Sequence, residues 1–466
     1  MTPQGPRLIV FSSLFPNAAQ PHAGLFIRER MFRVGRLLPV VVVSPRPWFP
    51  GQALIRRLRP GYRPQPARHE VQQSVEVWFP RFLALPGGLR QLDGVMMALA
   101  CLPTLWRLKR EHGYNLIDAH FAYPDGYAAS LLGRWLGLPV SITLRGTEVP
   151  HSRIPALRRR IAKALAGATR VFSVSDSLRQ LAVGLGMPAA KGRVIGNGID
   201  LDRFLPVPRT DARRRFGLPE DARVLVSVGA LVERKGFHRV IACLPALLEN
   251  TANLHYLIVG GANPEGDMLA ELRAQVAAAG LEERVHFLGA MPPDELKWPL
   301  SAADVFVLAT RNEGWANVFL EAMACGVPVV TTDVGGNREV VCRPELGTIV
   351  PFGDQAALTE ALREALHRDW PRQAILDYAA ENAWEVRVRI LLAEFAAVHA
   401  GAPIAGVVPA PTPLPVPATS PIEPGAELSS QLPGRQQTAA RPLAIPEPEG
   451  SAESRSRDFE GTGAHS

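Results

Sequence analysis

The sequence has few of the features that mark several protein classes. Only four cysteines occur among 466 residues, and they are scattered without the spacing of a disulfide framework or a metal site. No apolar stretch reaches the roughly 18 residues expected of a membrane-spanning helix. The apolar run of residues 7–13 is too short for a signal peptide and is typical of a first strand. These absences predict a cytoplasmic protein.

Two nucleotide-binding motifs are also missing. No Gly-x-Gly-x-x-Gly follows the first apolar run, which disfavours a dinucleotide-dependent oxidoreductase. No Gly-x-x-x-x-Gly-Lys-Ser/Thr occurs, which disfavours a P-loop enzyme.

Residues 401–466 contain 12 prolines and almost no aromatic residues. This composition predicts a disordered or polyproline-like tail.

Charge is distributed unevenly. Residues 1–205 contain 28 Lys and Arg against 11 Asp and Glu, a net charge of +17, whereas the remaining residues have a net charge of −10. A basic half favours an anionic partner, such as membrane headgroups, a phosphorylated substrate or nucleic acid. The alternative is a proteome that is rich in arginine throughout. Because no nucleic-acid-binding module is recognisable, we expect no nucleic-acid partner.

Short β-branched runs alternate with amphipathic stretches along the chain. This alternation predicts parallel sheets with helices on both faces, and its two sets predict two doubly wound Rossmann-like α/β domains. We place the domains at 1–205 and 206–377, with the boundary near 206–211 and the proline-rich tail beyond residue 400. The expected strands are 8–12, 40–44, 75–79, 116–120, 140–144 and 170–174, then 224–229, 254–260, 285–288, 305–309, 329–332 and 348–350.

The most informative motif is a pair of glutamates, Glu313 and Glu321, with seven residues between them. The apolar run 304–309 predicts a buried strand just before the pair. A short helix is expected at about 317–325, with Gly326 as its C-cap. Glu313 would then lie at the carboxyl end of a strand, and Glu321 one to two turns into the next helix.

This placement has a chemical consequence. In open α/β sheets, ligands bind in the crevice at the carboxyl ends of the strands, and a helix start there offers free N–H groups to an anion. Carboxylates accept strong, charge-assisted hydrogen bonds from hydroxyl groups. The motif therefore predicts a ligand with both phosphates and hydroxyls, such as a sugar nucleotide.

Two further turns lie at expected carboxyl ends of strands in the C-terminal half. In the turn 229–236, Arg234 and Lys235 could clamp a diphosphate, although a solvated charged turn is the alternative. Gly335 and Gly336 would allow the backbone to approach a ligand closely, or would simply form a tight turn. The Asn197-Gly198 sequence is mainly a turn signal.

The N-terminal half contributes weaker candidates. Gly24 lies between the first strand and a helix, where it could let the backbone approach a substrate. Asp118 and His120 would share one face of a strand, because strand side chains alternate; a lone His at such a place is more often structural. Arg145 follows the strand 140–144. The basic stretch 154–170 has an apolar stripe edged by cations, which suits either an anionic membrane surface or packing on its own sheet.

Taken together, residues 313–328 and the segment Gly335-Gly336-Asn337-Arg338-Glu339 resemble the family 4 retaining glycosyltransferases of the two-Rossmann-domain (B-type) fold. The resemblance covers about 7–395 and omits the tail. The Arg234-Lys235-Gly236 turn and residues 197–200 are consistent with it. It implies a nucleotide diphosphate sugar as donor, held mostly by the C-terminal domain, an acceptor-binding N-terminal domain, retention of anomeric configuration and no metal or other cofactor.

The resemblance also implies residue roles. Arg234 and Lys235 would neutralise the diphosphate, Glu313 would bind hydroxyls of the donor sugar, and Glu321 would bind the ribose hydroxyls. His120 would line the sugar side of the site. The donor would contact the backbone at Gly229, Gly314, Asn317 and Val318, and Gly24 would border donor or acceptor. A helix near 378–397 would complete the N-terminal domain.

Two departures from the family pattern concern the acceptor side. Many relatives have a His-Gly turn where this chain has Arg145-Gly146, and many have two glycines in the first loop, where this chain has only Gly24.

From the motifs and the basic N-terminal half, we expect a cytoplasmic, peripherally membrane-associated hexosyltransferase that acts on a glycan or lipid-linked acceptor in surface polysaccharide or glycolipid biosynthesis. The alternative is a non-catalytic glycosyltransferase-like protein of a polysaccharide assembly complex.

Overall fold

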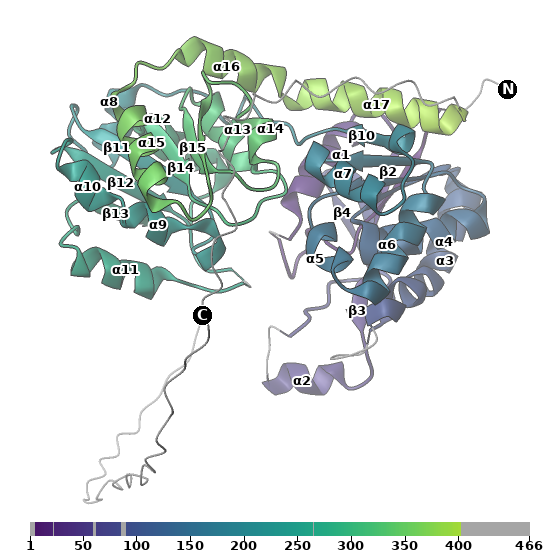
Figure 1. Ribbon diagram of the computed structural model, residues 1–466. Helices are drawn as coiled ribbons and strands as arrows, with labels where there is room; N and C mark the ends of the chain where they lie inside the picture. The colour runs from purple at the N-terminus through teal and green to yellow at the C-terminus, as the bar shows by residue number, and fades with distance from the viewer. Residues whose placement is uncertain (1–4, 22, 59–61, 85–89, 264, 402–466) are drawn as a thin grey trace, which may run out of the picture. The chain divides into compact units, whose positions relative to one another are not determined.

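Two mostly parallel β-sheets organise the chain (Figure 1). The computed structural model describes residues 5–21, 23–58, 62–84, 90–263 and 265–401. The expected proline-rich tail lies outside the described residues except for Gly401. Both sheets belong to one compact unit of the chain. The prediction of an α/β fold with two Rossmann-like sheets is confirmed.

The first sheet has eight strands in the order β10-β9-β8-β7-β1-β2-β5-β4. All neighbouring strands are parallel except β4 and β5, which form an antiparallel hairpin. The strands are β1 Leu8–Phe11, β2 Val40–Val43, β4 His69–Gln72, β5 Val75–Trp78, β7 Leu116–His120, β8 Val140–Leu144, β9 Arg170–Ser173 and β10 Gly192–Val194. A small separate sheet pairs β3 Arg46–Trp48 with β6 Arg81–Leu83.

The helices of this half follow the strands in the order expected of a doubly wound fold. They are α1 Leu25–Gly35, α2 Gln52–Leu58, α3 Asp93–His112, α4 Tyr127–Leu136, α5 Glu148–Ser152, α6 Pro155–Gly167 and α7 Asp176–Gly184. Alternate residues of β1 enter two different cores: Ile9 and Phe11 join one cluster, Leu8 and Val10 the other. The centre of the sheet is thus covered on both faces, which explains why β1 and β2 are continuous apolar runs.

The second sheet has six parallel strands in the order β13-β12-β11-β14-β15-β16. They are β11 Arg223–Val228, β12 Leu254–Val259, β13 Val285–Gly289, β14 Val305–Leu308, β15 Val329–Thr332 and β16 Gly347–Val350. The helices are α8 Arg209–Arg215, α9 Phe237–Ile241, α10 Leu244–Leu248, α11 Leu269–Ala278, α12 Lys297–Ala302, α13 Asn317–Ala324, α14 Asn337–Val340, α15 Gln355–His367 and α16 Arg372–Glu381.

The last described helix, α17, returns to the first half of the chain. It spans Trp384–Ala400, and it contacts α1. Val388, Leu391 and Phe395 are buried in the same cluster as β1, and the Phe395 ring meets that of Phe172 edge-on at 5.8 Å. The helix expected near 378–397 is thus two helices, α16 and α17, of which α17 packs on the first sheet.

Each sheet has one point where the strand order reverses. In the first sheet it lies between β1 and β7, and in the second it lies between β11 and β14. Loops that leave two such strands diverge to opposite faces, which leaves a crevice at their carboxyl ends. These two places are where a doubly wound protein binds its ligands.

Candidate functional site

The loops that follow β11 and β14 meet at the switch point of the second sheet. The backbone N–H of Arg311 donates to the carbonyl oxygen of Arg234 at 2.8 Å. Gly236 has φ 79°, and a Cβ atom there would lie 1.9 Å from the carbonyl oxygen of Ala309. Only glycine allows both this left-handed conformation and so close an approach. The glycine thus brings the cation turn against the acidic loop.

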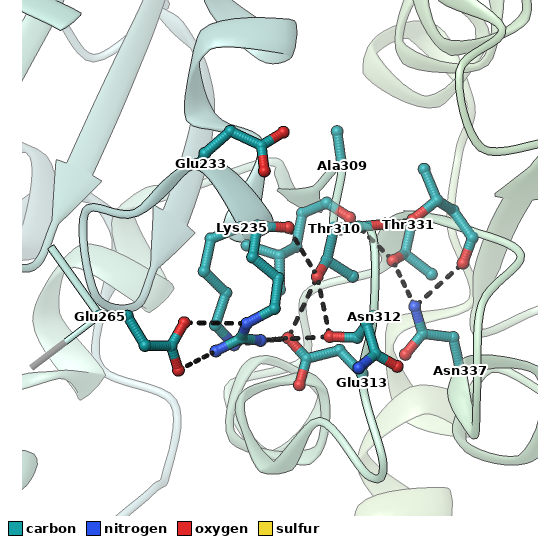
Figure 2. A network of polar contacts seen from close by, with 12 residues as sticks. Glu233, Lys235, Glu265, Ala309, Thr310, Asn312, Glu313, Thr331 and Asn337 are labelled. Atoms are coloured by element: carbon teal, nitrogen blue, oxygen red, sulfur yellow. Dashed lines mark hydrogen bonds and ion pairs between the residues drawn. The ribbon is translucent and has the colours of Figure 1, made fainter. Parts of the chain in front are cut away.

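Glu313 collects three hydrogen bonds on one carboxylate oxygen, as Figure 2 shows for Lys235 and Thr310. Lys235 Nζ donates to Glu313 Oε1 at 2.6 Å, and Arg234 Nη1 donates to the same atom at 3.3 Å. Thr310 Oγ1 lies 3.2 Å from it. The Glu313 side chain is 10% exposed and that of Lys235 is 15% exposed. The structure therefore brings together three of the residues expected in the donor site.

The guanidinium group of Arg234 is also held by Glu265, which the sequence analysis missed. Nε and Nη2 of Arg234 donate to the two carboxylate oxygens of Glu265, each at 3.1 Å. This bidentate pairing fixes the plane of the guanidinium. Burial acts to lower the pKa of Arg234, but its hydrogen bonds to Glu265 and the charge of Glu313 outweigh burial and raise the pKa. Arg234 is a fixed, permanent cation.

Glu321 has a different environment. It lies in the second turn of α13, and its carboxylate forms no hydrogen bond with the described residues. Burial raises its pKa to about 7, against the lowering effect of Arg203 and Lys235. Its carboxylate oxygens retain their capacity to accept hydrogen bonds. The sequence motif thus contains one carboxylate that is bound by cations and another that has no protein partner.

The start of α13 lies beside these groups. The helix begins at Asn317, and no side-chain oxygen caps it at Ala316. Val318 is in the first turn, where backbone N–H groups have no partner within the helix. Gly314 lies between Glu313 and this helix start. Gly229, at the end of β11, has the Lys235 side chain 3.6 Å from the position of a Cβ atom.

The paired glycines approach protein backbone. Gly335 has φ 52°, and a Cβ atom there would lie 1.7 Å from the carbonyl oxygen of Glu313. A Cβ atom at Gly336 would lie 2.4 Å from the carbonyl oxygen of Gly314. The loop after β15 therefore supports the loop that carries Glu313. The close approach seen is to the protein's own backbone, and a close approach of these glycines to a ligand stays a prediction.

In the first half, His120 belongs to a chain of polar contacts. Arg145 Nε donates to His120 Nδ1 at 3.1 Å, and Arg145 Nη1 donates to Asn197 Oδ1 at 3.1 Å. Asn197 Nδ2 in turn donates to Asn317 Oδ1 at 2.9 Å. His120, Arg145 and Asn197 are thereby linked to Asn317 at the start of α13. The Asn-Gly turn signal at Asn197 gave no indication of this role.

His120 itself is inaccessible to solvent, with 0% exposure. Burial and the nearby charge of Arg145 lower the pKa of His120 well below its usual value, so the imidazole is neutral. Because Nδ1 accepts from Arg145, the proton resides on Nε2, which lies 3.4 Å from Asp118 Oδ2. Burial raises the pKa of Asp118 to about 6. The shared face expected for Asp118 and His120 is present.

Two loop residues shape this region. Gly24, the N-cap of α1, has φ 73°, and a Cβ atom there would lie 2.5 Å from the carbonyl oxygen of Leu14. Glu148, which is 2% exposed, accepts hydrogen bonds from the backbone N–H groups of Ala122, Arg145 and Gly146. Glu148 therefore joins the loops that follow β7 and β8, a role for which the sequence carried no signal.

The apolar stripe of the basic stretch packs inside the protein. In α6, the residues Leu157, Ile161 and Leu165 are buried in the core beside the first sheet. The stripe is therefore a packing face and is not available to a membrane. Within the described part of the chain, no helix is long and apolar enough to cross a bilayer. Nor do the described residues include a group of three acidic, His or Cys side chains that could hold a metal ion.

Known proteins agree with this architecture. Residues 208–383 match the family model described as "Glycosyl transferases group 1", and residues 40–203 match "Glycosyltransferase Family 4". A crystal structure of Anabaena Alr3699/HepE in complex with UDP is similar with a TM-score of 0.64 and 18% identity, over 84% of this chain and 100% of that chain. That likeness shows the two-domain B-type fold.

Two curated relatives are closer in sequence. The putative teichuronic acid biosynthesis glycosyltransferase TuaC of Bacillus subtilis is 30% identical over 80% of this chain and 92% of its own length. The GDP-mannose-dependent alpha-(1-6)-phosphatidylinositol monomannoside mannosyltransferase of Mycolicibacterium smegmatis is 33% identical over 60% of this chain and 73% of its own. With both halves matched and the first relative covered almost completely, the chain belongs to the glycosyltransferases of the B-type fold.

Proposed function

We propose that this enzyme transfers a hexosyl group from a nucleotide diphosphate sugar to a glycan or lipid-linked acceptor, with retention of anomeric configuration. The observation on which this rests is the cluster of Arg234, Lys235 and Glu313 at the switch point of the second sheet. The names of the relatives, which concern teichuronic acid and a phosphatidylinositol mannoside, favour surface polysaccharide or glycolipid biosynthesis.

The cluster suits the charges of this reaction. Cleavage of the glycosyl–phosphate bond increases negative charge on the leaving diphosphate and positive charge on the sugar ring. Two cations that are already fixed in place stabilise the developing phosphate charge without reorganisation. Glu313 would accept hydrogen bonds from sugar hydroxyls while it orients Lys235, and Glu321 would accept from the ribose hydroxyls. We propose no resident metal or other cofactor.

The N-terminal contacts would serve the other side of the reaction. His120, neutral and hydrogen-bonded to Arg145, would orient that guanidinium toward the start of α13 and the donor sugar beside it. Gly24 would border the acceptor or donor. The donor backbone contacts would come from Gly229, Gly314, Asn317 and Val318.

Nucleotide binding is the first test. Thermal stabilisation of the full chain by UDP, GDP and ADP would identify the donor base, since a bound ligand raises apparent stability by mass action. The Lys235→Ala variant should lose most of this stabilisation. Stabilisation that is unchanged in Lys235→Ala would overturn the donor-site assignment, and no response to any nucleotide in the parent would favour a non-catalytic role in an assembly complex.

Transfer itself is tested with sugar nucleotides that carry the base selected by the first experiment. Product formation from acceptor extracts, followed by NMR of the anomeric proton, should show the donor's configuration retained. An inverted product would refute the proposed stereochemistry while leaving the donor site intact.

We also propose that the protein acts on the cytoplasmic face of a membrane as a peripheral protein. The net charge of +17 in residues 1–205 supports attraction to anionic lipids. Flotation with vesicles that contain anionic lipid should show binding that weakens with added salt. Absence of binding at low salt would refute it.

A further inference from the structure

We propose that the switch point of the first sheet is an acceptor site for an amphiphilic phosphate: a phosphoryl group joined to an apolar chain. This inference rests on the proposed transferase function and names the class of its acceptor. The site is a pocket of about 860 Å³, within the range of ordinary ligand pockets, roughly 300–1,000 Å³.

The position of the pocket follows from the topology. Ser13 and Leu14 follow β1, and Pro124 follows β7, the two strands between which the order of the first sheet reverses. Ser13 is joined across this point to Asp125, which accepts hydrogen bonds from its backbone N–H and its Oγ. The backbone contact of Gly24 with Leu14 places the first loop at the same wall. The pocket therefore occupies the crevice where such sheets bind ligands.

Three arginines line the pocket: Arg46, Arg63 and Arg90. None of them forms an ion pair with a carboxylate among the described residues. Among the lining residues that the structure describes, Asp93 is the one carboxylate, and burial raises its pKa against the lowering effect of Arg90 and Arg63. The lining is therefore net cationic and suits a ligand with negative charge.

Arg46 is the most informative of the three. It is 6% exposed, and its Nη2 donates to the carbonyl oxygen of Phe15 at 2.7 Å. Its Nε is buried without a hydrogen-bond partner. Burial lowers the pKa of Arg46 to about 10, so it is still a cation at neutral pH. The charges of Glu70 and Asp125 act to raise this pKa and offset part of the cost of burying the cation, and Nε is left to interact with an anionic ligand.

The other two arginines are held by different elements. Arg63 donates to the carbonyl oxygen of Ala84 at 2.8 Å and lies over the rings of Phe49 and Tyr62. Arg90 begins the short 3₁₀ turn before α3, and it is exposed. The three cations thus come from three separate segments of the chain. Folding alone brings them to one pocket.

Apart from Ser13 and Gln91, the rest of the described lining is apolar. It comes from the segments after β1 and β7 and from β3, β6, α3 and α6, and it includes Leu14, Pro47, Phe82, Met97, Pro124 and Leu157. Ile154 is 44% exposed and lies at the start of α6, whereas Phe82 and Leu157 are buried. A free sugar phosphate would leave this apolar surface without a partner. An acceptor with a phosphate and an attached hydrocarbon chain satisfies both parts of the lining.

Calorimetric titration of the full chain tests the chemical class. Farnesyl phosphate and dihexanoyl phosphatidylinositol supply both groups from the two lipid sources, an isoprenoid and a glycerolipid. Farnesol lacks the phosphate, and glycerol 3-phosphate lacks the chain. At least one of the two amphiphiles should bind tenfold or more tightly than both truncated probes, and the tighter one identifies the source. Equal affinity for farnesol, or for glycerol 3-phosphate, would overturn the proposal.

Variants locate the site. Arg90→Gln and Arg63→Gln should each weaken binding of the preferred amphiphile about tenfold, the usual loss for one charge-assisted hydrogen bond. Ile154→Ser should weaken it less, and the exposed control Arg159→Gln, on α6, should leave it unchanged. Binding that survives both arginine substitutions at full strength would place the ligand elsewhere and refute the assignment.

The result can be separated from that for the donor site. Nucleotide affinity should be unaffected by Arg90→Gln, whereas Lys235→Ala should lose nucleotide affinity and keep amphiphile affinity. If nucleotides fail to bind but farnesyl phosphate binds through Arg63 and Arg90, the transferase proposal falls and the anion pocket stands. If nucleotides bind and neither amphiphile does, the pocket assignment alone falls.

Discussion

Replacement of Glu313 by Gln tests the donor site most directly. The substitution keeps the shape of the side chain and removes the negative charge of the carboxylate, which accepts hydrogen bonds from Lys235 at 2.6 Å and from Arg234 at 3.3 Å. The side chains of Glu313 and Lys235 are 10% and 15% exposed. The energy of this ion pair should therefore be intermediate between that of a surface pair, about 0–1 kcal/mol, and that of a buried pair, whose disruption costs about 3–5 kcal/mol. We expect a loss of about 2 kcal/mol in the free energy of unfolding.

The effect on transfer should be larger than the effect on stability. Glu313 both orients Lys235 and would bind the sugar hydroxyls, so its replacement should lower kcat/KM by about 100-fold, as for loss of one preorganised polar group in a reaction site. Affinity for the nucleoside diphosphate alone should be unchanged or tighter, because a negative charge near the phosphates has been removed.

The assay combines three measurements: denaturant unfolding, nucleotide titration and transfer rate. A double-mutant cycle with Lys235→Ala isolates the pair, and we expect a coupling free energy of about 1–2 kcal/mol in stability. Zero coupling would mean that the ion pair is not populated in solution. Full transfer activity in Glu313→Gln would refute its role toward the donor sugar, whatever the stability.

Three other predictions follow from the site. Burial raises the pKa of Glu321 to about 7, so folding favours the protonated carboxyl. The stability that Glu321 contributes in this form is therefore complete below the pKa of the unfolded chain and is lost as pH rises toward 7. Glu321→Gln should remove this pH dependence from the free energy of unfolding. If Glu321 accepts from the ribose, nucleotide affinity of the parent should also fall as pH drops below 7, and an unchanged affinity from pH 8 to 5 would exclude that role. Gly335→Ala should cost roughly 2–3 kcal/mol and depress transfer, because its Cβ atom would lie 1.7 Å from a carbonyl oxygen; a thermally unchanged variant would contradict the geometry. Arg145→Lys should keep the charge but lose the forked contact to His120 and Asn197, so we expect transfer to fall about tenfold with nucleotide affinity intact. Wild-type kinetics would show that the contact is dispensable.

Much of the architecture could be read from local patterns. The strands of the second sheet, such as β14 and β15, are short apolar runs bounded by turn residues, and such runs are buried on both faces of a parallel sheet. The strand β4 was missed. It pairs with β5 through a two-residue turn at Gln73 and Ser74, both with positive φ. Hairpin turns of this kind usually contain Asn or Gly, so these residues gave no turn signal.

The site was predictable where its residues are close in sequence and obscure where they are not. Glu313 and Glu321 stand out because one strand–loop–helix unit contains both. Glu265 lies before α11, 48 residues before Glu313, the carboxylate that shares Arg234 with it, and nothing in its neighbours marks it. Asn197 looked like an ordinary turn residue.

The sequence by itself determined the two parallel sheets, the cation turn at Arg234 and the acidic motif of Glu313, because alternation, turn chemistry and short-range spacing are local properties. Only the tertiary structure decided which loops meet. The order of strands places the β11 loop beside the β14 loop and the β1 loop beside the β7 loop. That order depends on which apolar faces pack together across long separations, so neither the partners of Arg234 nor the pocket lined by Arg46 could be deduced from spacing along the chain.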